Sequence, residues 1–168
     1  MKTETLADNK LIVSMLLKSW TVHISKVNEL LDILPDEKLK EPVAPGRNTG
    51  IYLLGHLAAV HDALFPLLNF GNRLYPQLEI PFVKSPDNSG HEFPSVADLK
   101  LYWNVVNNTL LEKFNQLEPE EWLSRHTAVS EADFAKEPHR NKLNVLISRT
   151  NHLAYHWGQL VLLKGKGD

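Results

Sequence analysis

Residues 13–34 read VSMLLKSWTVHISKVNELLDIL, and nearly all the side chains that recur along them at alternating steps of three and four are apolar. Such a stripe is typical of a helix that packs against its neighbours in a bundle. The stripe consists of Val13, Leu16, Trp20, His23, Val27, Leu30 and Leu34. We expect a helix over about residues 5–34 that ends before Pro35, because proline removes a helical hydrogen bond.

Three further segments carry a helical pattern. An almost wholly apolar segment follows the Pro- and Gly-rich loop 41–50, another begins after Ser95, and the last begins after Asn141 and ends at Gly165. Their expected ranges are 50–70, 96–117 and 142–164, and the polar segment 118–140 should hold one or two short helical turns, such as 130–133. Because no β-type alternation persists, we predict an all-α fold, a four-helix bundle that forms one domain over residues 1–168.

The segment 71–94 joins the second and third expected helices and is long for a connection. It contains four prolines after Leu74 and the turn-forming run Ser-Pro-Asp-Asn-Ser-Gly over residues 85–90. Two roles are open: covering a functional site or partner surface, or simply crossing between bundle helices. We favour the crossover, since bundle topologies often need one long connection.

Composition narrows the function classes. The 168 residues carry a net charge of −2, and no Lys/Arg tract favours nucleic acid or a membrane surface. The apolar stretch 51–70 contains two histidines, an aspartate and a proline, which favours a buried helix over a membrane span.

The polar N-terminus predicts no signal peptide, and together with the absence of cysteine it predicts a cytoplasmic protein. We expect a small-molecule substrate and leave open a homodimer.

Eight histidines contrast with the absence of cysteine, so any metal site would use nitrogen and oxygen ligands. In the last helix, His152 and His156 lie four residues apart, on one face, where both imidazoles can reach one metal ion. A third ligand would come from the second helix, which offers His56 and His61. These two lie five residues apart, about 140° around the helix, and the pattern alone does not decide between them.

The segments Gly55-His56-Leu57-Ala58 and His152-x-x-x-His156-Trp157-Gly158-Gln159, on a bundle of this order, resemble the DinB/YfiT-like superfamily of metalloenzymes. The resemblance covers essentially the whole chain and implies a three-histidine metal site formed by His56, His152 and His156. It also implies a metal-dependent thiol transferase, isomerase or hydrolase, with a low-molecular-weight thiol as cosubstrate in the thiol-dependent cases. Tyr155 and Trp157 stand where the family commonly has a basic residue or a second histidine.

Five residues are candidates for the surroundings of such a site. Gln159 and Arg149 each lie one turn from the histidine pair. Gln159 either orients a ligand or bonds to a neighbouring helix, whereas we expect Arg149 to pair with an acidic side chain rather than bind an anionic substrate. For Trp20 and His23 we favour core packing over lining the pocket, and the same core role remains open for His61.

Asp62 would be costly to bury unpaired. It either accepts a hydrogen bond from a metal-bound or nearby histidine or pairs with a basic residue such as Arg73, and we favour Arg73. His91, His126 and His139 fall in polar segments and receive no role.

Two functions compete at this stage. One is an enzyme whose three imidazoles hold a divalent ion such as Zn, Ni, Fe or Mn, with open positions that activate water or a small thiol. The other is a non-catalytic helical module that acts through dimerisation or partner contacts, with structural histidines. Metal content separates the two.

Overall fold

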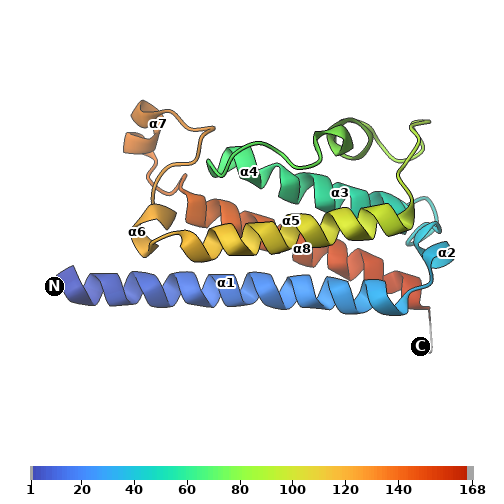
Figure 1. Ribbon diagram of the computed structural model, residues 1–168, viewed down its shortest axis with the longest axis horizontal. Helices are drawn as coiled ribbons and strands as arrows, with labels where there is room; N and C mark the ends of the chain where they lie inside the picture. The colour runs from blue at the N-terminus through green and yellow to red at the C-terminus, as the bar shows by residue number, and fades with distance from the viewer. Residues whose placement is uncertain (1, 166–168) are drawn as a thin grey trace.

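The computed structural model describes residues 2–165, and side chains from residue 7 onward (Figure 1). Over this range the chain is helical, without a strand. The four long helices are α1 (Lys2–Ile33), α3 (Gly50–Asp62), α5 (Val96–Gln116) and α8 (Lys142–Leu160). The short ones are α2 (Asp36–Leu39), α4 (Leu64–Leu67), α6 (Pro119–Trp122), α7 (Glu131–Lys136), the 3₁₀ turns η1 (Pro76–Leu78) and η3 (Val161–Lys164), and the π-helical turn η2 (Ile80–Lys84).

The long helices lie side by side, and their directions explain the long connection. α1 and α8 run one way along the molecule, while α3 and α5 run the other way (Figure 1). α3 contacts both α5 and α8, and α1 contacts α8. Because α3 and α5 are parallel, the chain must travel back along the molecule between them. The expected crossover role of residues 71–94 is therefore confirmed.

Side-chain caps start the helices close to the expected positions. The Ser95 hydroxyl accepts the backbone N–H of Asp98 at the start of α5, and the Asn141 side chain accepts that of Asn144 in α8. α7 lies where a short turn was expected. α1 begins at Lys2, before the expected residue 5, whose side chain lies outside the described residues.

Two helices end well before their expected ends. α8 ends at Leu160, and the 3₁₀ turn η3 continues to Lys164. The helix expected over residues 50–70 ends at Asp62, and a separate turn, α4, follows Ala63. Pro66 has no N–H to donate to the carbonyl of Asp62, and its ring crowds that carbonyl, so a regular helix cannot continue through this point. The stretch Gly50–Leu67 is long and apolar enough to cross a membrane, but 72% of it is buried inside the protein, as expected of a core helix.

The core consists of two apolar clusters. One surrounds the first half of α3 and the second half of α8, and the other surrounds Trp20, Phe114 and Trp122. The predicted stripe of α1 is mostly buried, with Trp20 1% exposed and Val27 fully buried. Among the side chains that the structure describes, four polar ones are also buried. By position along α3, α5 and α8 they lie near the boundary between the clusters. They are His61, Asp62, Asn107 and Thr150.

Candidate metal centre

Three histidines from α3 and α8 converge in the space between these helices. The Nε2 atom of His152 lies 3.2 Å from Nε2 of His56 and 3.1 Å from Nε2 of His156. The ligand nitrogens of all three residues lie within 4.8 Å of one another, and all three side chains are partly buried. We call these residues the three-histidine cluster.

The spacing of the cluster suits one metal ion. Two nitrogens bound at about 2.1 Å would be about 3.0 Å apart at a right angle and about 3.4 Å apart at a tetrahedral angle. The two measured Nε2–Nε2 distances, 3.2 and 3.1 Å, fall inside that interval. The two distances from His152 and the donor set of three imidazole nitrogens therefore fit a divalent transition-metal ion.

The orientation of His56 is set by a backbone carbonyl. Its Nδ1–H donates to the carbonyl oxygen of Phe82, in η2, at 2.7 Å. Since a carbonyl can only accept, the proton of the neutral ring is on Nδ1 and the lone pair on Nε2 faces the cluster. Phe82 is fully buried, and a Cβ at Gly55 would overlap its ring. Gly55 thus lets the connection approach α3 closely.

His156 is oriented by its own helix. Its Nδ1–H donates to Oε1 of Gln159 at 2.7 Å, and Nε2 of Gln159 in turn donates to the Tyr155 hydroxyl at 3.2 Å. This contact corresponds to the first of the two roles considered for Gln159, and it again leaves the Nε2 lone pair facing the cluster.

The α8 imidazoles are neutral at neutral pH. Burial, followed by the nearby His156, His56 and Arg149, lowers the pKa of His152 to about 4. Burial also lowers the pKa of His156, although its hydrogen bond to Gln159 opposes the change. Neutral imidazole is the form that binds a metal. Nδ1 of His152 is buried and has no hydrogen-bond partner among the described residues.

His61 is not part of the cluster. It is fully buried, with Nδ1 2.7 Å from Oδ1 of Asn107, and its ring makes tilted contacts with Trp20 and Trp103 at centroid distances of 4.6 and 5.1 Å. Burial lowers its pKa to about 3. Trp20 is accordingly a core residue, and His23, partly buried, bonds to the carbonyl of Ser19 on its own helix at 2.8 Å.

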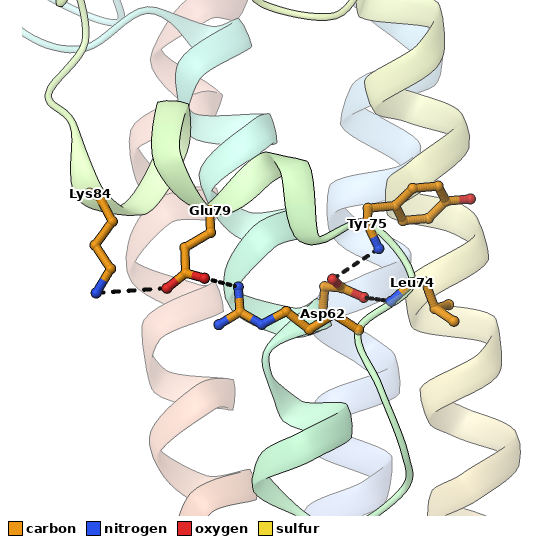
Figure 2. A network of polar contacts seen from close by, with 6 residues as sticks. Asp62, Leu74, Tyr75, Glu79 and Lys84 are labelled. Atoms are coloured by element: carbon orange, nitrogen blue, oxygen red, sulfur yellow. Dashed lines mark hydrogen bonds and ion pairs between the residues drawn. The ribbon is translucent and has the colours of Figure 1, made fainter.

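Neither of two expected ion pairs forms among the residues that the structure describes. Asp62 accepts the backbone N–H groups of Leu74 at 2.8 Å and Tyr75 at 3.1 Å, while Arg73 pairs with Glu79 at 2.9 Å (Figure 2). The pairing expected between Asp62 and Arg73 is therefore wrong, because backbone donors satisfy the buried carboxylate. Burial nevertheless raises the pKa of Asp62. Arg149 has no carboxylate partner among the described residues.

The connection that supplies the Phe82 carbonyl is tied to α3 at both ends. Asp62 holds its start through the two backbone bonds shown in Figure 2. Near the start of α3, the Tyr52 hydroxyl donates to the carbonyl of Ser85 at 2.8 Å, and the Thr49 hydroxyl donates to Asp87 at 2.8 Å. The connection is thus both a crossover and part of the site. Sequence reasoning did not find the contribution of Phe82, because a carbonyl acceptor leaves no trace in residue identity.

Comparison with known proteins adds a family match. The family model of the DinB superfamily matches residues 20–160. This range contains the whole of α3, α5 and α8, and with them all three histidines of the cluster. No curated protein matches the sequence.

Proposed function

The chain belongs to the DinB superfamily, and we propose that it is a metal-dependent enzyme in which His56, His152 and His156 hold one divalent transition-metal ion. In this proposal the scaffold is one four-helix-bundle domain built on α1, α3, α5 and α8. Nitrogen ligands of this kind suit Zn, Ni, Fe or Mn. Once bound to these three residues, such an ion would supply Lewis acidity toward a water or a small thiol.

One observation carries the proposal: three Nε2 atoms face one another, and two of them belong to rings whose protons are on Nδ1. The Phe82 carbonyl and the Gln159 side chain accept those protons, with Nδ1–O distances of 2.7 Å in both cases. The lone pairs of His56 and His156 therefore both point at His152, which has at most one proton on Nε2 to share. A cation at the centre satisfies all three nitrogens, whereas no arrangement of protons on neutral rings does so.

The chain's own residues would orient the ligands and admit the reactants. Phe82 and Gln159 fix the ring orientations, and the half-buried position of the cluster allows a small molecule to reach it. Because the chain contains no cysteine, a thiol in the reaction would have to come from a cosubstrate. A small-molecule substrate is part of the proposal, and a hydrolytic reaction uses the same site with water in place of the thiol.

Metal analysis of the full-length protein tests the proposal. We expect about one transition-metal ion per chain after purification without chelator, and loss of the ion in His56→Ala, His152→Ala and His156→Ala with the helical circular dichroism retained. His91→Ala and His139→Ala, at exposed loop positions, are the matched controls and should keep the metal. Absence of bound metal, even after incubation with Zn²⁺, Ni²⁺, Mn²⁺ and Fe²⁺, would favour the non-catalytic module instead.

The reaction class requires a second measurement. The metal-loaded protein would be assayed with an electrophile in the presence and absence of a small thiol, with His152→Ala as the blank. Thiol-dependent consumption of the electrophile identifies a transferase or isomerase, and consumption without thiol identifies a hydrolase. No turnover above the blank with any electrophile in a broad panel would contradict the enzymatic part of the proposal.

A further inference from the structure

A small pocket lies beside α8, one turn before the three-histidine cluster. Its volume is about 250 Å³, and it is open to solvent on one side. One wall is α8, the second is α4, and the third is the segment between α6 and α7. The lining residues are Leu67, His126, Asn144, Val145, Ser148 and Arg149.

The walls of this pocket are fixed by hydrogen bonds. Thr127 donates its backbone N–H to the carbonyl of Leu67 at 3.0 Å, which ties the α6–α7 segment to α4. The backbone N–H of Lys142 donates to the carbonyl of Ser124 at 3.0 Å, which ties the same segment to the start of α8. The pocket is therefore a built feature of the fold, not a gap between loose loops.

The lining is cationic and has unused donors. Arg149 is partly buried, and neither an acidic pocket residue nor any carboxylate among the described residues pairs with it. Nε of Arg149 and Nδ1 of His126 are both buried without a hydrogen-bond partner in the described part of the chain. Burial lowers the pKa of Arg149, which shows that its charge is partly stripped of water. Ser148 and Asn144 add neutral polar groups at the rim.

An unpaired, partly desolvated guanidinium in a pocket of this size favours a small anion. Its planar fork matches the two oxygens of a carboxylate or of a phosphate group. The volume is below the usual range for drug-sized ligands, so it suits the charged end of a molecule. Arg149 lies three residues before His152, about 4.5 Å along the axis of α8 and on nearly the same face.

We propose that this pocket binds a compact oxyanion, a carboxylate or a phosphate, with the Arg149 guanidinium as its main ligand and His126 as a neutral hydrogen-bonding partner. Anion binding at Arg149 is independent of the metal. We also assign this pocket a role in catalysis, and that part rests on the proposed function. The bound anionic group would anchor the substrate so that its reacting group lies at the three-histidine cluster.

Titration of the full-length protein with simple anions tests the pocket. Sodium acetate and inorganic phosphate would be added at constant ionic strength, and the ring resonances of His126, assigned with His126→Gln, would be followed by NMR. We expect a saturable shift with at least one of the two anions, and their relative affinities distinguish a carboxylate site from a phosphate site. Arg149→Gln should weaken the binding at least about tenfold, and Arg149→Lys should weaken it less.

Two controls separate this inference from the metal site. Arg47→Gln removes an exposed arginine from a distant loop and should leave the titration unchanged. The shift should persist after treatment with a chelator, and the metal content of Arg149→Gln should equal that of the parent protein. A linear shift without saturation, an unchanged affinity in Arg149→Gln, or loss of the shift with the chelator would each overturn the proposal.

Discussion

At the residue scale, Gln159 should control the metal affinity of His156. Its side-chain oxygen lies 2.7 Å from Nδ1 of His156 and accepts the Nδ1 proton, which keeps Nε2 free to bind a metal. We expect Gln159→Leu to lower Zn²⁺ affinity about 10- to 100-fold, because the ring loses its fixed orientation. Competition with a chromophoric chelator measures the change. Tyr155→Phe, which removes only the outer hydroxyl contact, should have a smaller effect, and equal affinities in Gln159→Leu and the parent would contradict this role.

A second residue, the buried His61, should make the folded protein less stable in acid. Burial lowers its pKa to about 3 in the folded protein, against about 6.5 in an unfolded chain. Between these values the unfolded chain binds a proton that the folded protein does not. The free energy of unfolding should therefore be unaffected by His61 above about pH 6.5 and decrease as pH falls through this window, by up to about 1.4 kcal/mol per pH unit.

The variant His61→Gln isolates this contribution, because an amide does not titrate. Urea unfolding of metal-free protein at several pH values between 4 and 7.5 should give a shallower pH dependence in His61→Gln than in the parent, whatever its stability at neutral pH. His139→Gln, at an exposed position, serves as the matched control and should retain the parent slope. Parallel curves for His61→Gln and the parent would show that the buried imidazole does not carry the effect.

The choice between His56 and His61, the two histidines of α3, shows how far the sequence alone could define the site. The spacing of His152 and His156 was sufficient to place both on one face of a helix. It could not choose between His56 and His61, since both faces of α3 are apolar. The structure separates them by what surrounds each ring: a backbone carbonyl and two other imidazoles for His56, and Asn107 with two tryptophans for His61. Those neighbours come from distant segments and leave no local signal.

At the element scale, the contact between α3 and the connection depends on one glycine. A Cβ at Gly55 would overlap the buried Phe82 ring, whereas a Cβ at Gly158, in α8, would meet no atom within 4 Å. We expect Gly55→Ala to lower the free energy of unfolding by about 1–3 kcal/mol, because the ring and its backbone must move. Gly158→Ala should instead raise it by about 0.5–1 kcal/mol through helix propensity. Chemical denaturation measures both.

A second readout links this element to the metal site. Movement of the Phe82 backbone would also release the Nδ1 proton of His56, so Gly55→Ala should weaken metal binding while Gly158→Ala should not. Replacing the ring with a smaller side chain, by adding Phe82→Leu to Gly55→Ala, should restore part of the lost stability and part of the lost metal affinity. If Gly55→Ala were as stable as Gly158→Ala, the close approach would not be a constraint on this fold.

The ends of helices were predictable where a capping side chain marks them. They were not predictable where no side chain marks the boundary. Ser95 and Asn141 cap α5 and α8, and both helices begin where the sequence placed them. The break after Asp62 was missed because the apolar pattern continues through it, although Pro66 supplies a physical reason. The turns η1 and η2 were also missed, since a Pro-rich segment offers no helical periodicity.

At the scale of the whole molecule, the three-histidine cluster joins the two antiparallel halves of the fold. α3 belongs to one parallel pair and α8 to the other (Figure 1), so an ion held by His56, His152 and His156 would cross-link them. An ion that binds only the folded protein should raise the free energy of unfolding by about 2.7 kcal/mol at a free concentration 100 times its Kd.

Thermal unfolding followed by circular dichroism, at increasing Zn²⁺ and constant protein concentration, measures this stabilisation. His152→Ala should show none of it, and His91→Ala should show all of it. An equal rise in His152→Ala would mean that Zn²⁺ acts elsewhere on the chain, and the cluster would then not be the link between the halves.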